Sequence, residues 1–266
     1  MTPPVVLTVA GSDSGAGAGI QADLKVFAAL GVYGTSVITA LTAQNTREVR
    51  AVLPTPADLV TAQLDAVLTD LPVQATKTGM LGTEAVADTV AAHARAGLLP
   101  NLVVDPVLVS TSGHRLGVVA AVERLLPYAL VVTPNREEAA ALVGRPVTTV
   151  DEMIAAAERI AARGPRHVVV TGGGDDDTGA GGEAVDVHWT GGESRLLPGA
   201  WVATRNTHGT GCSFSAAIAA RIALGDEVPA AVVFAKEYVA RALAGGRDWK
   251  LGTGHGPLDH FGWSRY

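Results

Sequence analysis

The sequence is poor in cysteine, in lysine, in aromatic residues and in charge. Cys212 is the only cysteine among 266 residues, which excludes an intramolecular disulfide and a zinc site built from a cysteine cluster. No apolar run approaches the ~20 residues that a membrane-spanning helix requires. The first ten residues also lack the basic segment and the cleavage signal of a secretory leader. We therefore expect a cytoplasmic protein with no membrane partner.

The charge balance is acidic, and apolar material is plentiful. Lys and Arg number 20 against 26 Asp and Glu, a formal net charge of −6. This balance argues against nucleic acid as a partner, because phosphate backbones attract positive surfaces. Hydrophobic residues make up 48% of the chain, which is ample for a large core. No linker divides the chain by composition, so we predict one domain over residues 1–266.

The chain alternates short β-branched runs with longer Ala- and Leu-rich stretches. This alternation predicts an α/β protein with a mostly parallel sheet covered by helices on both faces. We predict strands at 5–10, 33–39, 49–53, 73–77, 102–105, 130–133 and 167–171, and a hairpin of 184–189 with 194–197. We predict helices at 20–30, 56–71, 83–96, 117–126, 136–143, 151–163, 213–224 and 228–244. The polar segment 172–183 is predicted to be an exposed loop, with a calcium site as the less favoured alternative.

Several common site motifs are absent. None of the four lysines follows a glycine, so the chain has no P-loop. The dinucleotide-binding fingerprint fails because Ile20 stands where its last glycine belongs. In the segment GSDSG, Asp13 occupies the position that the serine of a nucleophile elbow would take. His255 and His260 have no third ligand nearby in the sequence, so a zinc site is not expected.

The segment NTHGTGC at 206–212 carries the strongest chemical signal. Gly209 and Gly211 directly precede an Ala-rich predicted helix. Glycines let successive backbone N–H groups point at one spot, and a helix N-terminus adds partial positive charge, so this segment predicts an anion or phosphate site. Cys212 lies in this field, which favours its thiolate and suits a base or nucleophile near pH 7. The alternative is a glycine-containing helix cap with a buried, inert cysteine.

Three further strand ends carry polar groups. The glycine-rich segment 10–25 follows the first strand and contains Asp13 and Asp23, each of which either caps a turn or faces a ligand. Asp105 ends an apolar strand, where a carboxylate is costly unless it is paired or holds a metal. Asn135 and Glu138 begin a helix, where they either form a cap or arrange Mg²⁺ through water. The carboxyl ends of parallel strands meet at one edge, so we expect these groups to converge there.

Taken together, these segments resemble the hydroxymethylpyrimidine/phosphomethylpyrimidine kinases of thiamine biosynthesis, which belong to the ribokinase-like superfamily. The resemblance runs from residue 5 to about residue 261. It is carried by residues 10–25, GVYGTSVITALTAQNT at 31–46, KTGML at 77–81, VVDPV at 103–107, TPNREEA at 133–139, NTHGTGC at 206–212 and GHGP at 254–257.

The resemblance implies a three-layer α/β/α sandwich, usually a homodimer, that transfers the γ-phosphoryl group of ATP with Mg²⁺. The implied acceptors are 4-amino-5-hydroxymethyl-2-methylpyrimidine and then its monophosphate. By position, the amide of Gln44 would hold the amino group and ring nitrogen of the pyrimidine, Met80 would pack against the ring, and the pocket would be completed by Gly11, Asp23 and the backbone of Val107.

The same resemblance assigns the chemistry to the late helix. Gly209, Gly211 and the Cys212 amide would form the anion hole, and the Cys212 side chain would be the base, where most of the superfamily has Asp. The implied nucleotide and phosphate contacts are Asn135, Thr210 and Lys236, and Glu138 would hold Mg²⁺ with Asp105 in support.

Two positions depart from the family pattern. Thr171 begins a segment that often reads Lys-Gly-Gly-His in the family, and Thr111 stands where many relatives carry Lys, so a cationic nucleotide contact is either lost or supplied elsewhere. A pyridoxal kinase of the same fold is the alternative activity, because Gln44 does not exclude a pyridine ring. A catalytically silent pyrimidine-binding module would show damage in the GTGC or TPN segments, and none is present.

Overall fold

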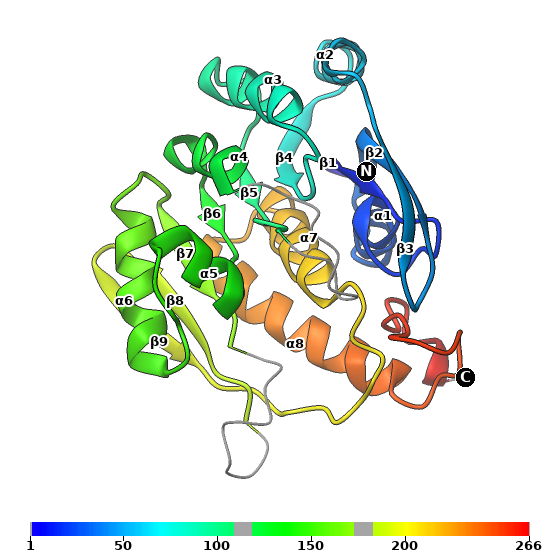
Figure 1. Cartoon of the computed structure of the whole chain (residues 1–266), viewed down its shortest axis with the longest axis vertical. Helices are drawn as coiled ribbons and strands as arrows, with labels where there is room; N and C mark the ends of the chain where they lie inside the picture. Colours follow the sequence, from blue (N-terminus) through cyan, green and yellow to red (C-terminus); the bar gives the residue numbers. More distant parts are fainter. Residues whose placement is uncertain (1, 109–118, 173–182, 266) are drawn as a thin grey trace.

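The computed structural model describes residues 2–108, 119–172 and 183–265. In these residues nine strands form one sheet in the order β3-β2-β1-β4-β5-β6-β7-β8-β9 (Figure 1). The six central strands, β2-β1-β4-β5-β6-β7, are parallel to one another, whereas β3 pairs antiparallel with β2, β8 with β7 and β9 with β8. Thr111 and most of the segment predicted as an exposed loop or a calcium site lie outside the described residues.

The strands are β1 Val5–Ser12, β2 Tyr33–Gln44, β3 Val49–Pro54, β4 Val73–Thr78, β5 Val103–Val104, β6 Val131–Val132, β7 His167–Val170, β8 Asp186–Thr190 and β9 Glu193–Leu197. The helices are α1 Gly19–Ala29, α2 Ala57–Leu68, α3 Glu84–Arg95, α4 Val119–Glu123, α5 Arg136–Val143, α6 Val150–Ala161, α7 Thr210–Ala223 and α8 Val228–Gly246, and short 3₁₀ turns lie at Leu126–Tyr128 and Trp263–Arg265.

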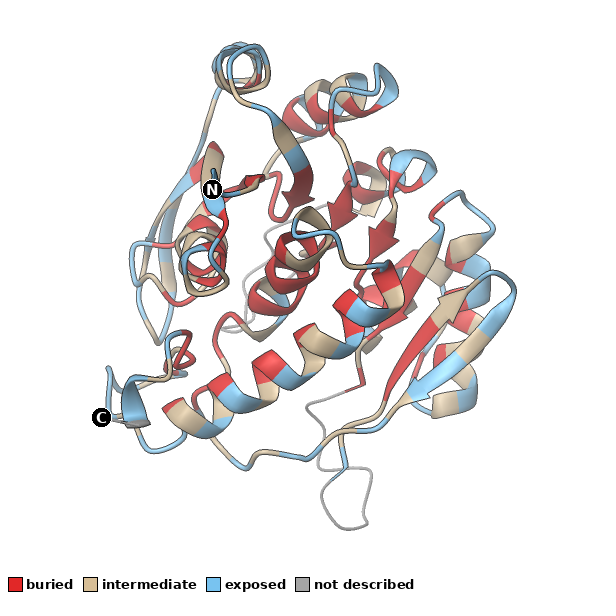
Figure 2. Ribbon diagram, turned by 180° about the vertical axis from the view of Figure 1, so that it is seen from behind, coloured by how far each residue is buried: buried red, intermediate tan, exposed pale blue. Residues whose placement is uncertain are grey.

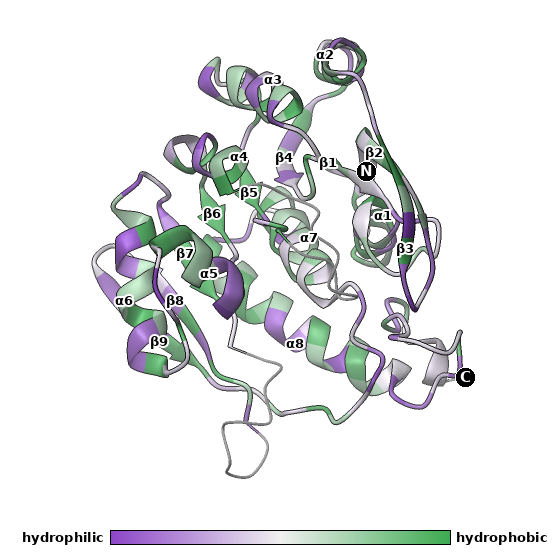
Figure 3. Cartoon of the chain, viewed as in Figure 1, coloured by the Kyte–Doolittle hydropathy of each residue, from purple (hydrophilic) through white to green (hydrophobic). Residues whose placement is uncertain are grey.

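Two apolar cores lie on opposite faces of the sheet, because successive strand residues point to opposite sides. In β1, Leu7 and Val9 belong to the core shared with α2, α3, α4, α5 and α6. Val6, between them, belongs to the core shared with α1, α7 and α8. The central strands β5 and β6 alternate in the same way and are coloured hydrophobic in Figure 3. The predicted three-layer α/β/α sandwich is confirmed.

Helix α7 is the most deeply buried helix of the second layer. Residues 213–220 are all buried, and Figure 2 shows most of this helix in red; the helix packs against α1, α8, β1 and β4. Its Ala- and Ser-rich sequence explains this position, because small side chains let the backbone approach β4 and the neighbouring helices closely. None of the helices in the described part of the chain is long and apolar enough to cross a membrane.

The sheet changes direction at β1. The chain passes from β1 through α1 to β2 on one side, whereas β4 and the strands that follow lie on the other side. In open α/β sheets such a switch point opens a crevice at the carboxyl ends of the strands, and ligands bind there. The fold therefore places the ends of β1 and β4, with their glycine-rich and Lys-Thr-Gly segments, at the expected binding edge.

Some element bounds differ from the sequence prediction. Strand β2 continues to Gln44, well past residue 39, because its second half pairs with β3 in an antiparallel hairpin. Helix α4 ends at Glu123 rather than 126, and a 3₁₀ turn that contains Pro127 follows it. Helix α5 was predicted correctly, since it has a capping box at one end and Gly144 in the left-handed conformation at the other.

Helix α2 offers a matched test of the core. Leu64 is 0% exposed and Leu59 is 52% exposed on the same helix. We expect Leu64→Ala to lower the free energy of unfolding by about 2–5 kcal/mol, because it leaves a cavity under β2. The control Leu59→Ala should change it by no more than about 0.5 kcal/mol. Urea denaturation followed by circular dichroism measures both, and equal losses in the two variants would contradict this packing.

Candidate active site

A cavity of about 940 Å³ runs along the carboxyl edge of the sheet. Its lining follows the strand order, beginning with Gln44 at the end of β2 and finishing with Asp186 at the start of β8. The strands from β2 to β7 span roughly 24 Å at about 4.8 Å per strand, which is room for two small ligands end to end. The first turn of α7 and part of α8 also line the cavity. The residues that line the cavity as a whole include Gly11, Asp13, Lys77, Met80, Asp105, Val107, Asn135, Glu138, Thr171, Lys236, His208, Gly209, Thr210, Gly211 and Cys212.

The N-terminus of α7 opens into the middle of this cavity. Gly209 caps the helix in the left-handed conformation with φ 88°, and a Cβ at this position would overlap the carbonyl oxygen of Gly17. Only glycine therefore lets the loop before α7 lie against the glycine-rich loop after β1. The first-turn amides beyond Gly209 point toward the cavity end of the helix, as an anion site requires. Gly209, Gly211 and Cys212 all line the cavity at this helix start.

The loop before α7 is fixed from behind by the end of α8. The side-chain nitrogen of Asn206 donates to the carbonyl oxygens of Gly246 at 2.7 Å and Trp249 at 2.9 Å. A Cβ on Gly256 would overlap the Asn206 side chain, and the amide of His208 donates to the Gly256 carbonyl at 3.1 Å. The segments NTHGTGC (206–212) and GHGP (254–257) therefore contact each other and together hold the loop before α7 in place.

The prediction that Cys212 favours its thiolate was wrong. Burial raises the pKa of the Cys212 thiol to about 12, and the negative charges of Asp105 and Asp23 add to this effect. The charge of Lys77 and an N–H of Gly19 act in the opposite direction but do not outweigh burial. The thiol also interacts with the carboxylate of Asp105, and this interaction opposes the effect of burial on the pKa of that carboxyl. Cys212 is therefore a neutral thiol at neutral pH, and its partner is a carboxylate.

Lys77 lies beneath this thiol and was not among the predicted site residues. Its Nζ donates to both carboxylate oxygens of Asp23, at 2.9 and 2.8 Å, and lies 3.7 Å from Oδ2 of Asp105. Lys77 and Asp23 have no exposed surface. Burial opposes the ammonium charge, but the nearby acidic groups outweigh it and raise the pKa of Lys77. The sequence signal that could have identified it is a lysine within a predicted strand, where a charge is costly unless it is paired.

Asp23 does not line the cavity, so its predicted contact with the substrate was wrong. Its carboxylate accepts from Thr8 Oγ1 at 2.6 Å and from Lys77, and both partners are fully buried. Asp23 lies on the inner face of α1, one layer below the ligand space. Its position in the sequence marked a polar helix residue but did not indicate which face of the helix carries it.

The opposite wall holds Gln44, His208 and Asp13. The Asp13 carboxylate accepts from the amides of Gly15, Gly17 and Ala18, which confirms the turn-capping interpretation. It also lies 2.8 Å from Nε2 of His208, whose ring approaches the Gln44 side chain at 3.3 Å. Burial alone would raise the pKa of Asp13, but the hydrogen bond and charge of His208 and the loop amides outweigh it and lower that pKa.

The far end of the cavity carries Asn135 and Glu138. Asn135 Oδ1 accepts from the Glu138 amide, and the Glu138 carboxylate accepts from the Asn135 amide, each at 2.9 Å, so the predicted cap is confirmed. Burial and the charge of Asp105 raise the pKa of Glu138 to about 8. Beyond it, Lys236 Nζ donates to Asp186 Oδ2 at 2.7 Å, and Asp186 Oδ1 accepts from the Gly172 amide.

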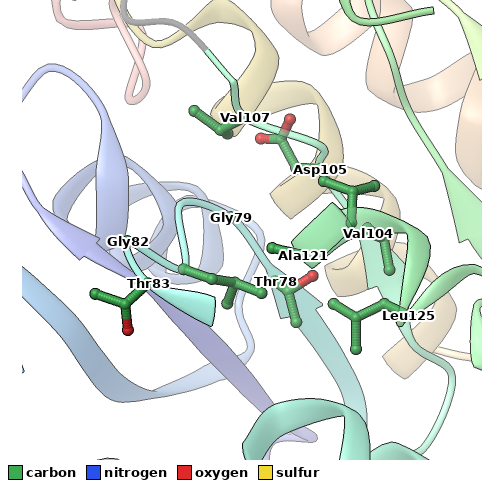
Figure 4. Close-up of a pocket in the computed structure, with 11 residues that line it drawn as sticks. Thr78, Gly79, Gly82, Thr83, Val104, Asp105, Val107, Ala121 and Leu125 are labelled. Carbon is green, nitrogen blue, oxygen red and sulfur yellow. The ribbon is translucent and has the colours of Figure 1, made fainter. Parts of the chain in front are cut away.

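A second, much smaller pocket lies under the edge of the cavity. Figure 4 shows Asp105 and Val107 at its upper side and Val104 and Leu125 at its apolar side. Its volume of about 10 Å³ holds no more than about one water molecule, so ligands bind in the large cavity. Among the described residues, no three His, Cys, Asp or Glu side chains gather closely enough to hold a metal ion alone.

The chain was compared with known proteins. Residues 13–259 match the family model described as phosphomethylpyrimidine kinase. The hydroxymethylpyrimidine/phosphomethylpyrimidine kinase of Rhizobium meliloti is 49% identical over 97% of each chain, and that of Streptomyces coelicolor is 47% identical over 99% of this chain and 96% of its own. A chloroplastic thiamine biosynthetic bifunctional enzyme of Arabidopsis thaliana is 48% identical over 97% of this chain, which spans about half (50%) of that enzyme's length.

Solved structures agree on the fold. The ADP complex of Bacillus subtilis pyridoxal kinase has a TM-score of 0.88 and 37% identity, and it covers all of both chains. The phosphomethylpyrimidine kinase of Clostridium difficile has a TM-score of 0.77 and 38% identity over 90% of this chain and 99% of its own. The chain therefore belongs to the phosphomethylpyrimidine kinase family, and it is a phosphotransferase with a ribokinase-like fold.

Proposed function

We propose that this enzyme transfers the γ-phosphoryl group of ATP to 4-amino-5-hydroxymethyl-2-methylpyrimidine and then to its monophosphate, in thiamine diphosphate biosynthesis. The observation that carries the proposal is that Gln44 and Cys212 line one cavity, together with the other residues at the N-terminus of α7. A carboxamide matches the amino group and adjacent ring nitrogen of an aminopyrimidine, and the helix amides match a phosphoryl group.

The relatives named for pyrimidine substrates support this choice over pyridoxal. Their identities range from 38% to 49%, whereas the pyridoxal kinase structures of Bacillus subtilis and Staphylococcus aureus are 36–37% identical. In the cavity, Gly11, Met80 and Val107 lie on the Gln44 side, where they would complete the ring pocket.

We assign the nucleotide to the side of the cavity formed by β6, β7 and α8. Val239 and Leu243 of α8 provide an apolar wall, and Asn135 and Thr210 provide polar groups. Lys236 lies on the same side as Thr171, where the family often carries a lysine, so we propose that Lys236 supplies the cationic contact. A pyridoxal kinase of Staphylococcus aureus was solved with the ATP analogue AMP-PCP and pyridoxal, which supports the use of ATP in this fold.

The donor set at Glu138 fits a magnesium ion. Glu138 and Asp105 are both buried carboxyl groups. Burial and the negative charge of Asp105 make the ionised form of Glu138 unfavourable, which raises its pKa. Mg²⁺ binds through one or two carboxylates, waters and substrate phosphates, so a pair is sufficient. We propose that Glu138 holds Mg²⁺ with Asp105 in support, and that the ion, when bound, neutralises phosphate charge.

Cys212 and Asp105 together suit the proton transfer. We propose that the alcohol oxygen attacks the γ-phosphorus as its proton passes to Cys212 Sγ, while the thiol proton passes to the Asp105 carboxylate. The bond from the γ-phosphorus to the bridging oxygen breaks, and ADP leaves. Burial raises the pKa of Asp105, so it is a better proton acceptor than an exposed carboxylate. The α7 amides hold the charge of the phosphoryl group during transfer.

We also propose a single-domain, cytoplasmic homodimer that binds neither nucleic acid nor membrane. Leu41 and Leu53 pair across β2 and β3 and are both exposed, and β3 is an edge strand. An exposed apolar pair on an edge strand is a suitable surface for a second copy.

The substrate assignment is tested by ADP release. Purified protein with ATP and Mg²⁺ is offered hydroxymethylpyrimidine, its monophosphate, pyridoxal and ribose in parallel. We expect turnover with the two pyrimidines, because only they present an amino group beside a ring nitrogen to Gln44. Turnover with pyridoxal alone would contradict the proposed substrate.

Substitution of Cys212 tests the proton transfer. We expect Cys212→Ala to lower kcat by about 10²–10⁴-fold with little change in KM for ATP, because the helix amides remain. A thiol whose pKa is about 12 stays protonated from pH 6.5 to 9. The wild-type pH–rate profile should therefore show no inflection that is due to Cys212 between pH 6.5 and 9. The profile of Cys212→Ala should have the same shape in that range. Such an inflection near pH 7 would instead mean that a thiolate is present before substrate binds.

The pKa of Glu138 predicts a proton release on nucleotide binding. Its pKa is about 8, so at pH 7 the carboxyl is mostly protonated, and a cation that binds there displaces the proton. Affinity for Mg²⁺ with ADP should rise as the pH increases toward 8. Calorimetry in two buffers of different ionisation enthalpy measures the release, which Glu138→Gln should remove and the exposed neighbour Glu137→Gln should keep. Equal proton release in Glu138→Gln and Glu137→Gln would mean that the cation binds at another position.

A further inference from the structure

The side chain of Gln44 lies between two polar groups whose own hydrogen bonds are already determined. Its carboxamide oxygen lies 3.3 Å from Oγ1 of Thr42, and its carboxamide nitrogen lies 3.3 Å from Nε2 of His208. The backbone of Gln44 is held at both its N–H and its C=O by the hydroxyl of Ser14, at 2.8 and 2.7 Å. The backbone of Gln44 is therefore fixed, and only the torsion angles of its side chain can change.

Thr42 can only accept a hydrogen bond from Gln44. Its hydroxyl has a single hydrogen, and it donates this hydrogen to the carbonyl oxygen of Ser12 at 2.8 Å. A carbonyl oxygen has no hydrogen to return, so this direction is fixed, and the bond is shorter than the 3.3 Å contact with Gln44. The atom of Gln44 that faces Thr42 must therefore be the NH₂ group if the two are to bind.

His208 can only donate a hydrogen bond from Nε2. The Asp13 oxygen that lies 2.8 Å from Nε2 is an ionised acceptor, which already receives the amides of Gly17 and Ala18. Nε2 must therefore carry the hydrogen, whatever Nδ1 contacts. The ring is 7% exposed and is packed so closely on the glycine-rich loop that a Cβ on Gly17 would overlap it. The atom of Gln44 that faces His208 must be the oxygen.

Both neighbours require the same orientation of the amide. A half-turn about the last side-chain bond of Gln44 exchanges its oxygen and nitrogen, and it converts two mismatched contacts into two hydrogen bonds. The oxygen then keeps one lone pair for the cavity, and the nitrogen keeps one hydrogen. From the His208 side to the Thr42 side, the amide offers the ligand an acceptor followed by a donor.

We propose that His208, positioned by Asp13, orients the Gln44 amide and thereby selects a six-membered ring that carries an amino group beside an unprotonated ring nitrogen. The inference rests on the proposed function and adds to it a residue that determines specificity. A 4-aminopyrimidine presents a donor beside an acceptor and matches the amide. Its 4-oxo analogue presents an acceptor beside an N–H and requires the opposite orientation, which His208 and Thr42 both oppose.

The test compares kcat/KM for the 4-amino and 4-oxo forms of the hydroxymethylpyrimidine. In His208→Leu the amide is held by Thr42 alone, and we expect the amino-to-oxo preference to fall at least about tenfold, as the loss of an orienting hydrogen bond implies. His208→Gln keeps an N–H near the position of Nε2, so it should retain most of the preference. A merely structural role would lower kcat/KM for both rings equally and leave their ratio unchanged.

Thr42→Val provides an independent arm, because it removes the acceptor at the other end of the amide with little change in volume. Thr42→Val should also reduce the amino-to-oxo preference in kcat/KM. If His208→Leu fails to fold, the result for Thr42→Val alone tests the proposal. An unchanged ratio in a folded His208→Leu or Thr42→Val variant would overturn the inference. A wild-type enzyme that phosphorylates neither pyrimidine would instead refute the proposed function, so the two failures are distinguishable.

Discussion

The site depends on how one buried ammonium group is shared. Lys77 faces Asp23, Asp105 and Cys212, and no other cation approaches these groups among the contacts of the described residues. Asp23 accepts two short hydrogen bonds from Lys77, so the ammonium charge of Lys77 mainly stabilises the Asp23 carboxylate. The remaining positive field is too weak to ionise the thiol against burial, which is why Cys212 stays neutral beside Asp105. Removing one partner of such a pair leaves an uncompensated buried charge, which proteins tolerate poorly.

The sheet arranges the parts of the site in a line. Parallel strands bring their carboxyl ends to one edge, and the order of the strands becomes the order of the chemical groups along the cavity. The residues proposed to recognise the ring lie at β2 and β1, Cys212 and Asp105 lie near β4 and β5, and the capped Glu138 follows β6. The N-terminus of α7 meets this line near its middle, where we propose that the phosphoryl group is transferred.

The sequence indicated the layers and the location of the site better than its electrostatics. Periodicity predicted most elements, and helix α5 was located correctly because its cap residues act locally. Asp23 was misplaced because a single polar residue on a helix does not reveal which face is buried. The Cys212 pKa was predicted in the wrong direction because the helix N-terminus is a local feature, whereas burial and the acidic neighbours come from distant segments. Lys77 and His208 were missed for the same reason, since their partners lie 54 and 195 residues away.

The support given to Asn206 has a consequence for the C-terminal part of the chain. Gly246, Trp249 and Gly256 hold the loop that begins the anion site, although none of them touches the ligand space. These three residues therefore hold in place a loop at the carboxyl edge of the sheet without lining the cavity themselves. A proteolytic cut or a fused tag that strains residues 246–257 would displace the start of α7, where we propose that the phosphoryl group binds, while leaving the strands of the sheet in place.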